Sequence, residues 1–364
     1  MNGEENQRRL WHPRGRAAQR PANSGSLAQR IPDNQAMPAT NPTMESTSHL
    51  LVPFAAASAP ECRALLPEMH LPNLTALLGE LKPGTTLDGD DHEFTPPHER
   101  ALAHALGLGL HDDGTLPWAA AESANPQMPQ AWFSPCHFRV GMDQVTLHSA
   151  ESLSLDGAHS RALLDALAPF CKEDGITLQF ECPTRWHAEG EPLRHLTCAS
   201  LDRVNGRSVA DWTAENQPDN AGMQLLKRLQ SEAQMLFYTH PVNDQREAAR
   251  QATINGFWVH GAGALEHPLI PANPKPTVRD NLRQPALAAD WPAWRQAWTE
   301  LDKTHIAAML QSVQKGEIVM LTLCGERHAA TWHNAAPRSA LARLGQAINT
   351  LRGQAPAWKQ LDTL

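Results

Sequence analysis

Two largely apolar runs constrain the fold of this chain more than any other feature. They cover His49–Phe54 near the beginning and Ile318–Leu323 near the end. A strand that is buried on both faces lacks polar alternation, and such strands are typical of parallel sheets covered by helices. Because helical patterns lie between the two runs, we predict an α/β fold with a mixed, mostly parallel sheet flanked by helices.

The segments between these runs have helical spacing, strand alternation or turn signals. A hairpin is expected around Gly141–Asp143, because strand-like residues lie on both sides of this glycine turn. Proline or aspartate at the start of an apolar stripe predicts the beginning of a helix. We expect helices after Pro72, Pro96, Asp156, Gly222 and Asp290, and strands at 132–140, 144–148, 176–181 and 256–260.

Composition divides the chain into three parts. Residues 1–47 are rich in Arg, Pro, Asn and Ser and are predicted to form a disordered tail. Residues 48–335 are predicted to form the α/β domain, with a proline-rich connector at 268–285. Residues 336–364 are expected to form a helical or irregular extension.

Charge and cysteine content argue against several classes of protein. The 364 residues have a formal net charge of −8, which disfavours a general nucleic-acid binder because such proteins carry clustered Lys and Arg. Neither a secretory signal nor a long apolar span is visible, so we expect a cytoplasmic protein that does not bind membranes. The six cysteines lack paired metal-site spacing and are interpreted as reduced core thiols.

A glycine-containing segment is the first candidate site. A short strand carries Trp258 and His260 into Gly261 and Gly263, which we interpret as a turn. Such glycines permit either contact with a ligand or tight backbone packing, and the sequence leaves both open. The signatures of phosphate loops and of dinucleotide-binding turns are absent from this segment.

Two further pairs of residues are candidate ligand contacts. Arg203 and Arg207, close to Asp202, are candidates for gripping a phosphate or carboxylate, although an internal ion pair between Asp202 and Arg203 is the simpler alternative. His240 and Asn243 follow a predicted helix end. An imidazole there serves either as a general base or phosphate partner, or as a cap of its helix.

The sequence predicts no metal site and identifies no catalytic residue. Seven acidic and histidine residues are candidates, but none of them has a compact ligand spacing such as His-x-x-x-His. A serine or cysteine nucleophile motif is also missing. The candidate metal ligands are Asp90, Asp91, His92, His137, Asp143, His187 and His195.

Taken together, several segments between about residues 48 and 328 resemble the bacterial family called regulatory protein RpfE, whose members are often labelled cofactor-independent phosphoglycerate mutases. The mutase label implies an alkaline-phosphatase-like or phosphomutase-like fold, in which acidic residues and histidines hold two metal ions and a serine accepts the phosphoryl group. The segments that carry the resemblance are LLVPFA, LPNLTALL, PPHERALAHALGL, PCHFRVGMDQVTL, DGITLQFECPTRW, SLDRVNGR, LQSEAQMLFYTHPVND, NGFWVHGAGAL and LTLCGER.

This chain departs from the mutase pattern at the positions that matter for metal binding. The resemblance implies an aspartate directly after the first strand, whereas the chain has Val52–Ala57 there. It also implies a late Asp-His pair, but the acidic-His neighbours here are Asp91-His92 and Glu266-His267. Two closely spaced divalent ions require several carboxylates to offset their charge.

We therefore expect a regulatory or ligand-binding protein that is related to the mutases and lacks their metal site and their catalysis. No cofactor is predicted, and the ligand is expected to be a small phosphorylated or carboxylate molecule. One alternative is an active mutase or phosphatase that uses Mn or Mg, with Asp143, His137 and His240 as ligands. The second alternative is a protein-binding scaffold that uses the Trp-rich helix at 291–298, with an unknown partner.

Overall fold

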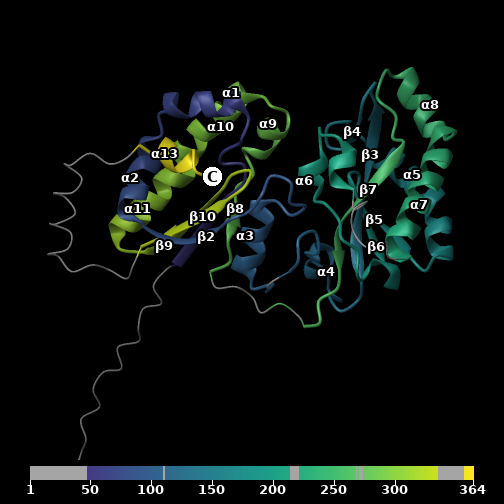
Figure 1. Ribbon diagram of the computed structural model, residues 1–364, viewed down its shortest axis with the longest axis horizontal. Coiled ribbons are helices and arrows are strands. Elements are labelled where there is room, and N and C mark those ends of the chain that lie inside the picture. The colour runs from purple at the N-terminus through teal and green to yellow at the C-terminus, as the bar shows by residue number, and fades with distance from the viewer. Residues whose placement is uncertain (1–46, 110, 214–220, 268, 270–273, 335–355) are drawn as a thin grey trace, which may run out of the picture. The chain divides into compact units, whose positions relative to one another are not determined.

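The computed structural model describes residues 47–109, 111–213, 221–267, 269, 274–334 and 356–364 (Figure 1). These residues belong to one compact unit. The predicted tail lies outside the described residues except for Thr47, which begins the first strand. Of the predicted extension, 356–364 are described and contain the short helix α13, Trp358–Leu361.

The first sheet has the strand order β2-β10-β9-β1-β8. Strand β1 runs parallel to both of its neighbours, β9 and β8, whereas β10 runs antiparallel to β9 and to β2. The two apolar runs of the sequence therefore lie side by side as β1 and β9, which confirms this part of the prediction. The strands are β1 (Thr47–Val52), β2 (Lys82–Leu87), β8 (Thr277–Val278), β9 (Ile318–Cys324) and β10 (Ala329–His333).

The second sheet is antiparallel throughout and is built around the long strand β3. One edge of β3 pairs with β7, and the other pairs with β6 along its first half and with β4 along its second half. The predicted hairpin around Gly141–Asp143 is confirmed as the β3–β4 connection. The strands are β3 (Gln130–Val140), β4 (Val145–Ser149), β5 (Thr177–Cys182), β6 (Arg185–Glu189) and β7 (Gly256–Gly263).

The prediction of a single, mostly parallel sheet is wrong, although the α/β class is confirmed. Among the described strands only the pairings of β1 are parallel, and the other pairings are antiparallel. The physical reason is the short connections, since Gly141–Gln144 and Pro183–Thr184 are too short for the crossover that parallel neighbours require.

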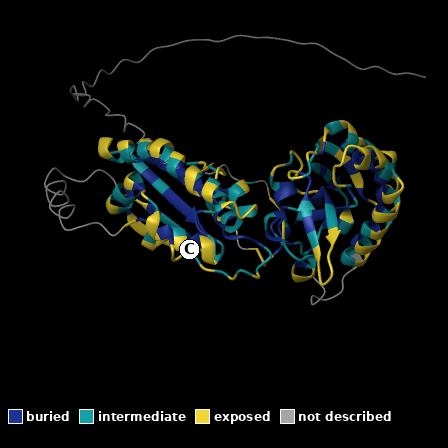
Figure 2. Ribbon diagram, turned by 90° about the horizontal axis from the view of Figure 1, so that it is seen from above, coloured by how far each residue is buried: buried dark blue, intermediate teal, exposed yellow. Residues whose placement is uncertain are grey.

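Helices cover each sheet and enclose separate apolar cores. Trp294 and Trp298 are fully buried against the first sheet, and Leu163, Leu229 and Phe237 are fully buried against the second. In Figure 2 the exposed residues lie on the outer sides of the helices. The α-helices are α1 (Pro60–Leu65), α2 (Pro72–Glu80), α3 (Pro97–Leu106), α4 (Trp118–Ala121), α5 (Gly157–Glu173), α6 (Leu201–Val204), α7 (Ala221–Tyr238), α8 (Pro241–Ala248), α9 (Arg283–Leu287), α10 (Trp291–Leu301) and α11 (Ala307–Lys315). The other helical segments are η1 (Leu66–Glu68), η2 (Glu191–Leu193), η3 (Val209–Trp212) and η5 (Asp302–Ile306).

Burial of two of the three indoles of α10 weakens the scaffold alternative, whereas Trp291 is half-buried. Trp294 and Trp298 donate their indole N–H groups to the carbonyls of Phe54 and Ala55, so both rings are core residues with satisfied donors. No described helix is long and apolar enough to cross a membrane. The six cysteines are free thiols, and most of them are buried.

Two local predictions around the glycine segment need correction. The polar stretch after His240 is the helix α8, because Pro241 occupies its first turn and the His240 side chain accepts a hydrogen bond from the Val242 N–H. Gly261 and Gly263 are not a turn but the last part of β7, where Gly263 still pairs with Gln130 of β3.

The proline-rich connector is part of the first sheet rather than only a linker. Its described residues include β8, which pairs with β1. They also include the beginning of α9. Residues 268 and 270–273 lie outside the described part of the chain.

A buried aspartate connects two helical segments that are far apart in the sequence. Asp302 is 2% exposed and lies at the start of η5. Its carboxylate accepts hydrogen bonds from the backbone N–H groups of Asn73 and Leu74 at 3.3 and 2.7 Å, and from the Asn73 side chain at 3.0 Å. The first turn of α2 has no cap from its own N-terminal residue, so Asp302 supplies the acceptor that the turn lacks.

We predict that Asp302→Ala lowers the free energy of unfolding by about 2 kcal/mol, because the substitution leaves buried donors of α2 unpaired. Chemical denaturation measures this change. The control is Asp290→Ala, which removes the local cap of α10 and is expected to cost about 1 kcal/mol. A smaller loss for Asp302→Ala than for Asp290→Ala would contradict this account of the capping.

Candidate functional site

A cavity of about 400 Å³ collects charged side chains from several segments of the chain. Its volume is within the range of small-molecule sites. The lining comes from the segment after β1, the start of α3, α6 with the turn after it, the end of α9 and the segment after β9. We call it the Arg203 cavity, and its lining residues are Phe54, Ala56–Ala59, Pro96–His98, Asp202, Arg203, Asn205–Arg207, Ala286, Leu287, Ala289, Trp291, Gly325 and Glu326.

Asp202 anchors one side of the cavity through Arg283 and His98. Both carboxylate oxygens accept hydrogen bonds from the Arg283 guanidinium, with Nε distances of 2.9 and 3.0 Å. His98 Nε2 lies 3.2 Å from Asp202 Oδ2. Burial by itself would raise the pKa of the Asp202 carboxyl, but the hydrogen bond with His98 and the charge of Arg283 hold this pKa well below its usual range. Asp202 is therefore an ionised and fully engaged carboxylate.

Glu326 anchors another side in a similar way. Its carboxylate accepts a hydrogen bond from the Ser58 N–H at 2.8 Å and forms an ion pair with Arg207. Burial by itself would raise the pKa of Glu326, and the Ser58 N–H and Arg207 together hold it below its ordinary value. The Arg207 side chain remains 40% exposed, so its guanidinium is accessible from solvent.

Arg203 differs from these ion pairs because it lacks a carboxylate partner among the described residues. It is 3% exposed, and its guanidinium donates to the backbone carbonyls of Glu326 and Asp90, both at 3.1 Å. Its Nε has no hydrogen-bond partner in the described part of the chain. Burial, followed by the like charge of Arg207, lowers the pKa of Arg203, but an arginine remains protonated in proteins. The cavity wall thus holds a buried positive charge without a carboxylate at ion-pair distance among the described residues, although the charges of Glu326 and Asp113 act to raise the pKa of Arg203.

Arg246 shows what distinguishes Arg203. Arg246 is also buried and also donates to two carbonyls, those of Ala252 and Leu153. However, Arg246 does not line the Arg203 cavity. A buried guanidinium alone is therefore compatible with a structural role, whereas Arg203 combines burial, a cavity and a second arginine.

The structure brings together two of the residues predicted to bind a ligand and separates the others. Arg203 and Arg207 both line the cavity, and the simple ion pair expected between Asp202 and Arg203 is wrong because Asp202 pairs with Arg283. His240 caps α8. Asn243 is buried and bonds to the backbone of Phe237 and Ile254. A ligand role for His240 and Asn243 stays a prediction.

The remaining predicted residues lie on β7. Trp258 donates to the Ala199 carbonyl and lines a separate cavity of about 70 Å³. His260 contacts Ser134, with its Nε2 2.9 Å from the hydroxyl oxygen. Gly261 and Gly263 have φ angles of 62° and 136°, and a Cβ atom would lie 2.9 Å from Trp132 and Pro117, respectively. Tight packing accounts for both glycines, and their contact with a ligand stays a prediction.

Several cavity residues were missed by sequence reasoning. Phe54, His98 and Glu326 line the cavity, and Arg283 bonds to its lining residue Asp202, through contacts that join distant parts of the chain. The proline-rich start of α3 placed His98 at the beginning of a helix, but this position gave no indication of its partner Asp202. The unusual feature of Phe54, its left-handed φ of 56°, is visible only in the structure.

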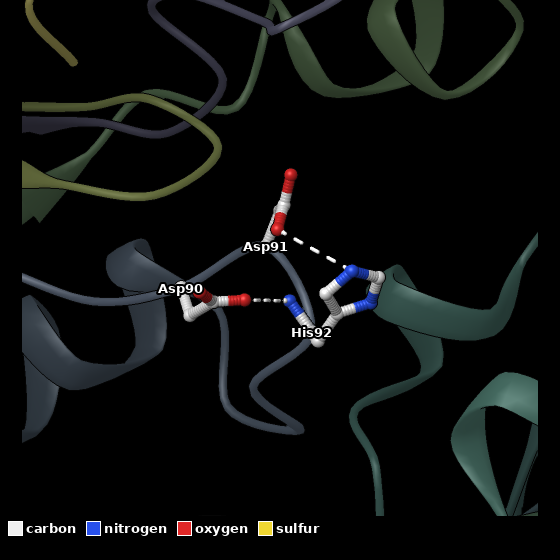
Figure 3. A group of neighbouring side chains, drawn as sticks. All are labelled: Asp90, Asp91 and His92. Atoms are coloured by element: carbon white, nitrogen blue, oxygen red, sulfur yellow. Dashed lines mark hydrogen bonds and ion pairs between the residues drawn. The ribbon is translucent and has the colours of Figure 1, made fainter.

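Among the described residues, one group of three has the spacing for a metal ion. The ligand atoms of Asp90, Asp91 and His92 lie within 4.8 Å of one another. Figure 3 shows the Asp90 carboxylate directed at the His92 backbone N–H and Asp91 facing the imidazole, 3.8 Å away. The His92 side chain is 85% exposed. The expected alternative ligands Asp143, His137 and His240 do not form such a group, so that ligand set is wrong.

The cavity residues do not fit a pair of divalent ions. Of the carboxylates that line it, Asp202 is engaged by Arg283 and His98, and Glu326 is engaged by Arg207 and Ser58. The buried positive charge of Arg203 would also oppose a divalent cation. The donor chemistry of the cavity is therefore that of an anion site.

Comparisons with known proteins show distant structural similarity only. The cofactor-independent phosphoglycerate mutase from Thermoplasma acidophilum is 14% identical with a TM-score of 0.35, over 87% of this chain and 98% of the mutase. The PH0037 protein from Pyrococcus horikoshii is 9% identical with a TM-score of 0.43, over 80% of this chain and 87% of PH0037. At these scores we carry over neither residue roles nor activity.

No family model and no curated protein matches the chain. The resemblance to the RpfE family therefore stays a prediction.

We predict that Asp202→Asn lowers the free energy of unfolding by about 3 kcal/mol, because it leaves the partly buried cation of Arg283 without its carboxylate and removes the charged partner of His98. Denaturant titration checks this value. The matched control is Asp174→Asn, whose partner Arg228 is 55% exposed and whose loss is expected to cost at most about 1 kcal/mol. Equal losses for the two variants would contradict the proposed role of the Asp202 network.

We predict that protonation of His260 destabilises the fold at acidic pH. Burial, together with the charge of Arg185, lowers the pKa of His260 to about 4. An unfolded chain has a histidine pKa near about 6.5, so this contribution is fully present above that pH and is lost as the pH falls towards 4. The slope is at most about 1.4 kcal/mol per pH unit.

Stability curves between these pH values test the role of His260. His260→Gln is expected to flatten the curve, because glutamine does not titrate and can still bond to Ser134. The control is His70→Gln at an exposed position. An unchanged curve for His260→Gln would assign the pH dependence to other groups.

Proposed function

We propose that this protein binds a small phosphorylated or carboxylate ligand in the Arg203 cavity and acts as a regulatory or ligand-binding protein without the two-metal chemistry of a mutase. The sequence resemblance supports a distant relation to the cofactor-independent phosphoglycerate mutases and to their alkaline-phosphatase-like fold. The chemistry of the site itself comes from this chain's own residues.

The buried charge of Arg203 is the observation that carries this proposal. A cation removed from water is costly unless an anion or several hydrogen bonds replace its hydration. Two carbonyls satisfy part of the guanidinium, while Nε stays without a partner among the described residues. An incoming phosphate or carboxylate in the cavity would supply the missing negative charge.

Arg207 and His98 extend the same site. The guanidinium of Arg207 is partly exposed and neighbours Arg203, so one oxyanion can bond to both. His98 lines the cavity beside Asp202, with its Nε2 3.2 Å from the carboxylate. The arrangement supports recognition of a negatively charged group and offers no unengaged carboxylate for general base work.

A metal-dependent mutase or phosphatase is the second candidate. The group Asp90, Asp91 and His92 favours it, because oxygen and imidazole ligands of this kind hold Mn or Mg. This candidate predicts turnover of phosphoglycerate that depends on added Mn²⁺ or Mg²⁺. It also predicts that alanine at Asp90 and Asp91 abolishes that turnover.

We predict that the purified full-length protein binds inorganic phosphate, and that Arg203→Met weakens this binding at least about tenfold, the effect of losing one charge-assisted hydrogen bond. Isothermal titration calorimetry in the presence of a chelator measures both affinities. Arg203→Lys is expected to retain part of the affinity, because it keeps the charge and loses the fork of donors.

Arg246→Met is the matched control, since it removes a buried guanidinium that also binds two carbonyls but does not line the cavity. It is expected to lower stability and to leave phosphate affinity unchanged. No phosphate binding by the unmodified protein, or an equal loss in both variants, would refute the anion site. Binding that requires Mn²⁺ would favour the metal-dependent candidate.

A further inference from the structure

The Arg203 cavity combines its charged group with a wide apolar wall. Ten of its nineteen lining residues are apolar, so the apolar surface is larger than a small polyhydroxylated phosphate could cover with hydrocarbon of its own. Among them are Phe54, Ala57, Ala286, Leu287 and Trp291. A cavity of about 400 Å³ is also larger than one phosphate group requires, so the remaining space adjoins hydrocarbon surface.

Phe54, Ala57, Ala286 and Trp291 of this apolar wall pack against the core cluster of the first sheet, whereas Leu287 does not. Helix α9 has no buried residue, and Leu287 at its end is half-buried and lies outside the core cluster that includes Leu282 and Trp294. Leu287 nevertheless lines the cavity. Its apolar surface therefore remains available to a ligand, and covering that surface would be favourable.

Phe54 lies where the apolar wall meets the charged group. Its φ of 56° places a bulky residue in the left-handed region, which is unfavourable for a side chain of this kind. The Trp294 indole bonds to the Phe54 carbonyl at 2.9 Å, and the Trp298 indole bonds to the next carbonyl, so two buried tryptophans hold this conformation. The Phe54 ring lies 5.0 Å from the His98 ring. An aromatic surface is thus fixed beside the anion-binding residues.

We propose that the ligand of the Arg203 cavity is an amphiphilic anion, namely a phosphate or carboxylate that carries an unbranched or aromatic hydrocarbon group. This inference rests on the proposed function and narrows its ligand class. The anionic group binds Arg203 and Arg207, and the hydrocarbon covers Phe54 and Leu287. A three-carbon phosphorylated hydroxy acid lacks the hydrocarbon that this wall would contact.

Calorimetry of the full-length protein with inorganic phosphate and with methyl, butyl and hexyl phosphate tests this ligand class. The matched alkyl carboxylates, acetate to heptanoate, are titrated alongside. Affinity is expected to rise about threefold to fourfold for each added methylene until the cavity is filled. Such a gradient in either series supports the inference.

A flat series with measurable phosphate binding would overturn the amphiphile and leave the anion site standing. Absence of binding by phosphate and by every member of both series would overturn the anion site, and the inference with it. Tighter binding of 3-phosphoglycerate than of hexyl phosphate would also overturn the inference, because it would show that polar contacts dominate.

Variants locate the hydrocarbon contact. Leu287→Asn is expected to lower the ratio of hexyl to methyl phosphate affinity at least about threefold, because it replaces apolar wall by an amide. The control is Leu225→Asn, a half-buried leucine of α7 that does not line the cavity, and it is expected to leave the ratio unchanged. An unchanged ratio for Leu287→Asn, or the same fall in both variants, would contradict the assigned wall.

Discussion

The positive charge of Arg203 is the constraint on which this account of the site depends. A buried guanidinium keeps its proton, so the surrounding structure must replace its lost hydration. Two backbone carbonyls replace part of that hydration. Both carboxylates that line the cavity are already engaged by other arginines, Arg283 and Arg207. The remaining demand is for an anion, which is why the cavity is suited to recognition of a phosphate or carboxylate.

The same arrangement explains why a likeness to phosphoglycerate mutases need not include their chemistry. In this chain the segment after β1 supplies Phe54 and a run of alanines to the cavity instead of acidic ligands. The backbone of that segment is held by the indoles of α10, so its conformation is set by core packing. The lining of the cavity is therefore cationic and apolar, with two engaged carboxylates.

Elements with a strong local pattern could be predicted from the sequence. The two apolar runs became β1 and β9, the glycine turn joined β3 to β4, and Asp156 capped α5. Predictions failed where a partner lies far along the chain. The end of β7 was interpreted as a turn, because nothing near Gly263 reveals its pairing with Gln130.

The candidate site shows the same difference between residues with a local sequence pattern and residues whose partners lie far along the chain. Arg203 and Arg207 were identified because they lie close together in a short polar segment. Their surroundings were not, since Arg207 meets Glu326 and Asp202 meets Arg283 through contacts between distant segments. His98 and Phe54 carried no local signal of function. Chemistry-bearing residue types are visible in a sequence, but the charge balance around them is a property of the fold.

A crystal structure of the protein soaked with tungstate, an anomalously scattering oxyanion, tests the central claim most directly. The account predicts an anomalous peak in the Arg203 cavity, beside the guanidinium groups of Arg203 and Arg207. An empty cavity in the tungstate soak would contradict it. So would a manganese peak held by Asp202 and Glu326 in a parallel soak, because those carboxylates would then serve a cation.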